Sequence, residues 1–117
     1  ICIGETLEDK EKGITKDILE DQLKKSIPIS SNFKNSIIAY EPVWAIGTGL
    51  TPTNDEINET HSFIRQHNAK FNKFKIIYGG SVKANNVNEI TSLLNVDGAL
   101  IGGASLKSDE FTKIIQD

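Results

Sequence analysis

One glutamate in this sequence, Glu41, stands where a side chain could act as a base. It directly follows residues 37–40, Ile-Ile-Ala-Tyr, an apolar run of β-forming residues that is typical of a buried strand. Pro42 cannot donate to a sheet ladder, so the strand stops there and the chain turns outward. Residues 43–46 are more apolar than is usual for a solvent-exposed loop without a function. Residues 47–49, Gly-Thr-Gly, let backbone N–H groups approach an anion. The segment predicts a base, an apolar lid that excludes water and a phosphate contact.

Two more turns in the sequence could contact the same anion. Ser81 follows a glycine pair at the end of an apolar run, and Gly102 and Gly103 follow a later run, residues 96–101. Backbone N–H groups in such turns and at helix N-termini are ready donors for phosphate. A glycine pair taken singly is more often only a tight turn, but several turns of this kind in one chain favour a phosphate site.

The elements that must position these turns alternate along the chain. Short β-forming runs predict strands, and apolar residues at intervals of three and four predict helices between them. The predicted strands are residues 1–4, 37–40, 75–78 and 96–101. This alternation requires parallel strands with crossover helices, and ligands of such folds bind at the carboxyl ends of the strands. Glu41 and the glycine turns should therefore meet at one rim.

Polar side chains predict where the helices begin, because they can accept from the first free backbone N–H groups. The expected caps are Thr6, Thr15, Thr53 with Glu56, and Asn86 with Glu89. Gly13 can end the first helix. The helix after Thr53 is expected to run toward residue 70, and the last helix is expected to begin at Ser108.

Length and composition fit a single domain, residues 1–117, with 38% hydrophobic residues to build a core. The net charge of −3 and the dispersed lysines leave no basic surface for nucleic acid. No apolar run approaches the roughly 20 residues of a membrane span, so a soluble, cytoplasmic protein with no membrane contact is expected. Cys2, the single cysteine, cannot form an internal disulfide and is expected to be a small buried thiol.

Three other titratable residues are candidates for chemistry. Glu5 also follows a strand, but the favoured interpretation is a carboxylate that anchors the neighbouring loop and takes no part in acid–base catalysis. His61 and His67 are six residues apart and so lie on different faces of their predicted helix. Because no cysteine or carboxylate cluster completes a ligand set, we expect neither a metal site nor a catalytic role for either histidine.

Residues 39–49 resemble the signature of the triosephosphate isomerases. Residues 2–6, 78–82 and 97–106 resemble further segments of the same family, in the same order, so the resemblance runs from end to end. It implies an α/β fold, a partial (β/α)₈ TIM barrel made of carboxyl-terminal βα units with parallel strands. A complete barrel has about 250 residues. The chain is therefore expected to be a fragment, from the end of the fifth barrel strand onward.

The resemblance also implies an activity and the residues that perform it. The family are aldose–ketose isomerases of glycolysis and gluconeogenesis that interconvert dihydroxyacetone phosphate and D-glyceraldehyde 3-phosphate through an enediolate, without cofactor or metal, as homodimers. They are the standard example of a glutamate base beneath a closing loop. By position, Glu41 matches that base, and Leu100 matches an apolar residue that packs against it. The backbone N–H groups matching those that hold the substrate phosphate belong to Gly47, Ser81, Gly102 and Gly103.

The sequence departs from the family in two respects. Residues 50–52 are Leu-Thr-Pro where the family often has Lys-Thr-Ala, so Pro52 narrows the range of the lid hinge. The family's electrophilic lysine and histidine come from earlier strands, so this chain alone is expected to be inactive. Another phosphate-binding barrel enzyme, an inactive phosphate-binding module and a purely structural fragment remain alternatives.

Overall fold

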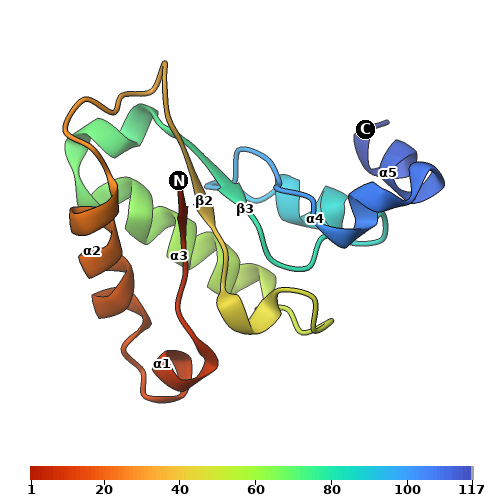
Figure 1. The fold of residues 1–117 in the computed structure, drawn as a ribbon, viewed down its shortest axis with the longest axis horizontal. Coiled ribbons are helices and arrows are strands. Elements are labelled where there is room, and N and C mark those ends of the chain that lie inside the picture. Colours follow the sequence, from red (N-terminus) through yellow and green to blue (C-terminus); the bar gives the residue numbers. More distant parts are fainter. Residues whose placement is uncertain (117) are drawn as a thin grey trace.

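Three parallel strands form the sheet in the computed structural model, which describes residues 1–116. Their order in the sheet is the order in the sequence, β1 (Cys2–Ile3), β2 (Ile37–Tyr40) and β3 (Lys75–Tyr78) (Figure 1). β2 is central: Ala39 pairs with Cys2 on one side and with Ile77 on the other. Parallel neighbours need crossover connections, and the helices supply them.

Within residues 1–116, five helices and three 3₁₀ turns connect and flank the strands. The helices are α1 (Leu7–Glu11), α2 (Thr15–Ser26), α3 (Asn54–His67), α4 (Val87–Thr91) and α5 (Ser108–Ile115). The 3₁₀ turns are η1 (Val43–Ala45), η2 (Ala69–Lys73) and η3 (Gly103–Leu106). In Figure 1, α2 lies to the left of the strands and α1 lies below them, while α4 and α5 lie to the right.

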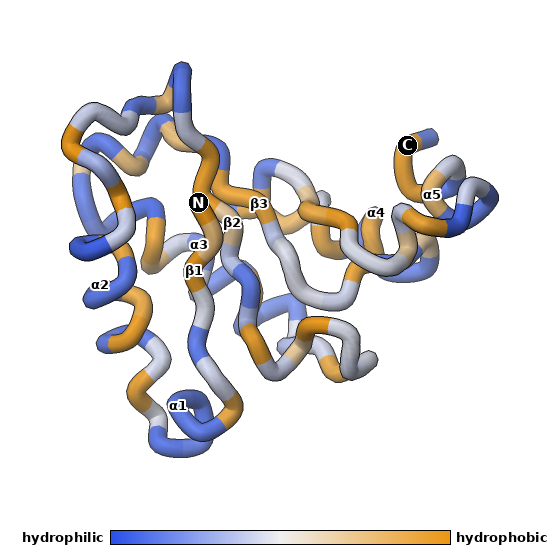
Figure 2. The backbone as a smooth tube through the Cα atoms, viewed as in Figure 1, coloured by the Kyte–Doolittle hydropathy of each residue, from blue (hydrophilic) through white to orange (hydrophobic). Residues whose placement is uncertain are grey.

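One hydrophobic cluster joins the strands to the helices. Side chains of α2 and α3 that recur every three or four residues are buried against those of β2 and β3, since each element turns one apolar face inward. The most deeply buried aliphatic members of the cluster are Leu19, Ile38, Ile57, Ile64 and Ile76. Figure 2 shows hydrophobic segments along the strands and hydrophilic segments on α1 and the outer side of α2. Across residues 1–116, no helix combines the length and apolar character that crossing a membrane requires.

Of the four predicted helix caps, two form and two do not. Thr6 and Thr53 each cap a helix as predicted, and both do so in a capping box, which was predicted for Thr53 only; in each the side chain accepts from a backbone N–H three residues later. The prediction for Thr15 was wrong: the Ile14 carbonyl already accepts from Ile18 at 3.0 Å, so α2 begins one residue earlier than expected. The prediction for Asn86 was also wrong, because its side chain is engaged in the preceding turn.

Two further expectations about the elements need correction. Residues 96–101 were predicted to be a strand, but the structure has only an isolated bridge between Tyr78 and Ala99. The segment is nevertheless held along β3 by backbone bonds, since the Tyr78 N–H donates to the Gly98 carbonyl at 3.0 Å and the Leu100 N–H to the Tyr78 carbonyl at 2.8 Å. α3 ends at His67, short of residue 70, and continues as the separate turn η2. Gly13, by contrast, takes a φ of 71° directly after the first helix, as a terminating glycine does.

Candidate active site

Glu41 lies immediately after β2, between the ends of the two outer strands. Its backbone N–H donates to the Ile3 carbonyl at 2.7 Å, and the neighbouring Gly79 N–H donates to the Tyr40 carbonyl at 2.8 Å. Gly79 allows Glu41 its observed position, because a Cβ on residue 79 would lie 2.5 Å from Glu41 Cγ and would force that side chain to move. The sheet register and one glycine together place this carboxylate at the rim.

The lid that follows Glu41 is attached to the core through Glu5. This carboxylate is 2% exposed, and its Oε1 accepts hydrogen bonds from the Tyr40 hydroxyl at 2.8 Å and from Trp44 Nε1 at 3.1 Å. The Glu5 carbonyl also accepts from the backbone N–H of Val43 at 2.9 Å. The prediction that Glu5 anchors the neighbouring loop is therefore confirmed. Burial, then the Glu5 charge, raises the pKa of Tyr40, so its hydroxyl remains a donor.

The tip of the lid is closed by local bonds and tied to the next turn. Thr48 Oγ1 donates to the Trp44 carbonyl at 2.8 Å, and Gly47 and Gly49 take φ values of 68° and 77°, which other residues rarely adopt. The Ser81 hydroxyl donates to the Ala45 carbonyl at 2.6 Å. This contact of the Ser81 side chain with the lid was not anticipated from the sequence.

All six predicted site residues line one open cavity of about 830 Å³. They are Glu41, Gly47, Ser81, Leu100, Gly102 and Gly103. Three charged residues that sequence reasoning missed also line it, namely Lys83, Lys107 and Glu110. The signal that could have found them is their position, because each lies within eight residues of a glycine turn.

Several backbone N–H groups that line this cavity are available to an anion. Within residues 1–116, the N–H groups of Ser81, Gly102 and Gly103 are among those that donate to no other backbone or side-chain group. Gly103 is also the first residue of η3, where N–H groups point away from the turn. Because Lys83 and Lys107 also line it, the cavity combines amide donors and positive charge with carboxylate side chains.

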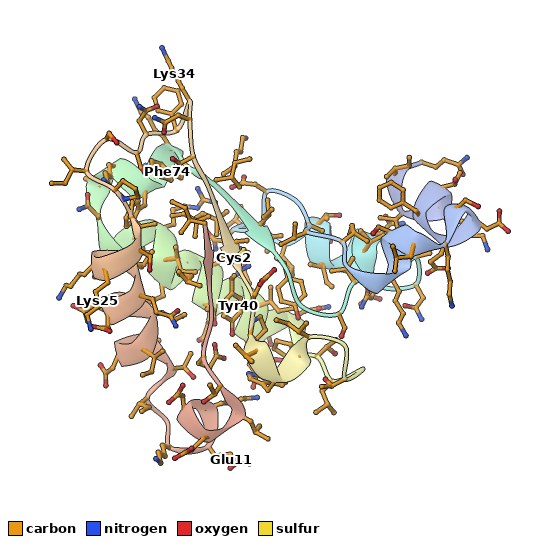
Figure 3. All side chains as sticks on the ribbon, viewed as in Figure 1. Cys2, Glu11, Lys25, Lys34, Tyr40 and Phe74 are labelled. Atoms are coloured by element: carbon orange, nitrogen blue, oxygen red, sulfur yellow. The ribbon has the colours of Figure 1, made fainter. Side chains whose placement is uncertain are left out.

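Cys2 corrects a prediction: its thiol is exposed, not buried. It lies on β1, which pairs with only one strand, so one flank of the residue is uncovered. Figure 3 places Cys2 beside the central strand, close to the end that carries Tyr40. Partial burial and the nearby Glu41 charge raise the pKa of the thiol, which favours its protonated form.

The two histidines of α3 lie outside the cavity. His61 is fully buried and packs edge-on against Tyr40 with 5.8 Å between ring centroids, and burial lowers its pKa to about 4. His67 stacks on Phe71 at 6.4 Å. In the part of the chain that the structure describes, no group of three His, Cys, Asp or Glu side chains could hold a metal ion.

Comparison with known proteins gives consistent matches. The family model described as triosephosphate isomerase matches residues 1–117. The triosephosphate isomerase of Rhizobium meliloti (strain 1021) is 52% identical over 119 residues, which cover 97% of this chain and 46% of that protein. That of Bradyrhizobium sp. (strain ORS 278) is 49% identical, with coverage of 97% and 47%. A crystal structure of triosephosphate isomerase from Bartonella henselae aligns with a TM-score of 0.85 and 42% identity, over 97% of this chain and 47% of that one. The chain thus spans about half the length of these relatives.

Proposed function

The chain belongs to the triosephosphate isomerase family, and from this premise we propose that it supplies the base and the phosphate site of an enzyme that interconverts dihydroxyacetone phosphate and D-glyceraldehyde 3-phosphate. The observation that carries the proposal is the single cavity shared by Glu41 and the three glycine turns. The cavity offers a base and phosphate donors, and a triose phosphate presents the matching groups, an acidic C–H beside a carbonyl and a phosphate.

In this proposal Glu41 moves a proton between adjacent carbons of the substrate, through an enediolate. A hydrated carboxylate is a feeble base, so the site must exclude water when the substrate binds. The apolar lid residues Val43 and Ile46, which are half exposed, can cover the cavity when the lid closes. Leu100, which is 38% exposed and lines the cavity, would pack against the base.

The phosphate end would be built from main-chain donors. The N–H groups of Gly47, Ser81, Gly102 and Gly103 would hold the phosphate oxygens, because amides in turns and at a helix start bind anions without a change in protonation. The Ser81 hydroxyl bond to Ala45 supports this arrangement, since it holds the lid beside the second turn.

The chain alone is proposed to be inactive. In the family, the electrophilic lysine and histidine come from earlier strands, and neither His61 nor His67 lines the cavity. We propose that the residues described here form the carboxyl-terminal part of one barrel domain, and that the complete protein is a cytoplasmic homodimer without metal or cofactor, as the family resemblance implies.

The test uses a completed barrel, in which this chain replaces the matching segment of the Rhizobium meliloti relative. Glu41→Gln in the completed barrel should lower kcat by about a thousandfold or more, because the amide cannot accept the proton. Glu11→Gln is the matched control, since Glu11 is exposed on α1 and points away from the strands (Figure 3).

Three outcomes would contradict the proposal. Unchanged turnover in the Glu41→Gln variant would favour a phosphate-binding module or another barrel enzyme in place of an isomerase. Near-native turnover by the purified 117-residue chain would refute its proposed inactivity. Failure of inorganic phosphate to protect the Gly103 amide from hydrogen exchange in the completed barrel would leave only a structural role for the glycine turns.

A further inference from the structure

We propose that Glu110 is a positioning residue that sets the distance between the second and third glycine turns; this rests on the proposed function, in which those turns hold a phosphate. The backbone N–H of Ala84 donates to Glu110 Oε1 at 2.8 Å, across 26 residues of sequence. Glu110 is partly buried and lines the same cavity as Ser81 and Gly103. Its carboxylate therefore joins the two sides of the phosphate end.

The second glycine turn, residues 79–81, continues into residues 82–86, and Asn86 closes this segment internally. The Asn86 side-chain amide donates to the Ser81 carbonyl at 3.0 Å, and its Oδ1 accepts from the backbone N–H of Lys83 at 2.8 Å. The Asn86 N–H also donates to the Lys83 carbonyl at 3.2 Å. Because these bonds span the turn from end to end, a bond to Ala84 orients the whole turn, including the Ser81 N–H.

The third glycine turn, Gly102–Gly103, is joined to Glu110 through η3 and the start of α5. The Gly102 carbonyl accepts from both the N–H and the hydroxyl of Ser105, at 2.9 and 2.6 Å. The Lys107 carbonyl then accepts from the Phe111 N–H at 2.9 Å, in the first turn of α5. Glu110 is part of this continuous η3–α5 unit, so its bond to Ala84 fixes the position of one turn against the other.

The charge of Glu110 does not explain its presence in the cavity. A carboxylate in the wall of an anion site repels the anion, and Lys83 and Lys107 in the same wall offset that repulsion. The backbone N–H of Ala84 needs an acceptor oxygen on a side chain as long as that of glutamate. Reach and charge can be separated, because Gln keeps the reach and the acceptor oxygen while Asp keeps the charge and is one methylene shorter.

The experiment compares Glu110→Gln and Glu110→Asp in the completed barrel. We expect the Gln variant to stay within about twofold of the parent. We expect the Asp variant to raise both KM for the triose phosphate and the dissociation constant of inorganic phosphate about tenfold, with kcat within about threefold, because one hydrogen bond that aligns the donors is lost. Asp109→Asn, on the exposed side of the same helical turn, is the control and should change neither constant.

The outcomes separate this inference from the proposed function. If the Gln and Asp variants lose phosphate affinity equally, the effect is due to charge. If the Asp variant loses no phosphate affinity, Glu110 has no positioning role. Either result overturns the inference. If the Asp variant does not fold, hydrogen exchange of the Ala84 amide is measured in the parent and in the Gln variant. The amide should be protected in both, and rapid exchange in both refutes the bond. A parent that binds phosphate without turnover overturns the proposed function alone, whereas a parent that binds no phosphate overturns both.

Discussion

The base region and the phosphate end of the cavity are held in place by different means. Glu41 follows the central strand, and its lid is anchored on the buried Glu5 carboxylate, through Tyr40 and Trp44. The glycine turns of the phosphate end follow β3 and the segment bridged to it, and Gly102 and Gly103 are exposed. The part that would perform chemistry thus depends on a buried anchor, while the part that would bind phosphate depends on polar bonds that join one turn to another.

This difference predicts that each region can be damaged without the other. A change that displaces the Glu41 side chain should lower kcat and leave phosphate affinity unchanged. A change at Glu110 should lower phosphate affinity and leave kcat nearly unchanged. A buried change at the Glu5 anchor should also lower the stability of the fold. The following substitutions in the completed barrel test this separation in order of decreasing effect.

Gly79→Ala should have the largest of these effects. The added Cβ would lie 2.5 Å from Glu41 Cγ, and that side chain can rotate away, so the base moves while the fold persists. We expect kcat to fall about a hundredfold with phosphate affinity unchanged. Gly98→Ala is the control, because its Cβ would meet only Ile77 Cγ2 at 3.4 Å. A tenfold loss of phosphate affinity in Gly79→Ala would break the proposed separation.

Glu5→Leu should weaken the base region through its anchor. Leu cannot accept from Tyr40 or Trp44, which leaves a buried hydroxyl and an indole N–H without their acceptor. We expect the free energy of unfolding, measured in denaturant, to fall by about 2 kcal/mol. Glu5→Gln keeps an acceptor oxygen and should lose less. If both variants are as stable as the parent, Glu5 does not support the lid energetically.

His61 should give the smallest effect, a dependence of stability on pH. Burial lowers its folded-state pKa to about 4, below the ordinary value of about 6.5, so the unfolded state takes up the proton first. Its contribution to stability is complete above pH 6.5 and is lost as the pH falls toward 4. We expect a loss of about 1 kcal/mol between pH 6.5 and 5.5.

The control for this pH effect is the second histidine of α3. His61→Leu should remove the pH-dependent loss relative to the parent, whereas His67→Gln should retain it, because burial of His61 is its source. Parallel unfolding curves for the parent and the His61→Leu variant at both pH values would show that His61 is not the titrating group.

Local patterns were sufficient for much of the fold. Short apolar runs located β2 and β3, and the capping box at Thr53 and the cap at Thr6 located two helix starts, since each depends on residues a few positions apart. The prediction of a strand at residues 96–101 was wrong, because strand formation depends on the segments that lie alongside as well as on β propensity. The prediction that Asn86 caps α4 was wrong, because its side chain forms hydrogen bonds in the preceding turn.

The sequence by itself determined which residues could be the base and the phosphate donors, because a carboxylate after a strand and glycines in turns have that chemistry wherever they lie. Only the tertiary structure decided that Cys2 is exposed beside Glu41, that the Ser81 hydroxyl holds the lid, and that Glu110 joins two turns. These three facts depend on contacts across 26 to 39 residues of sequence, and such contacts are set by the packing of strands and helices, which no local pattern records.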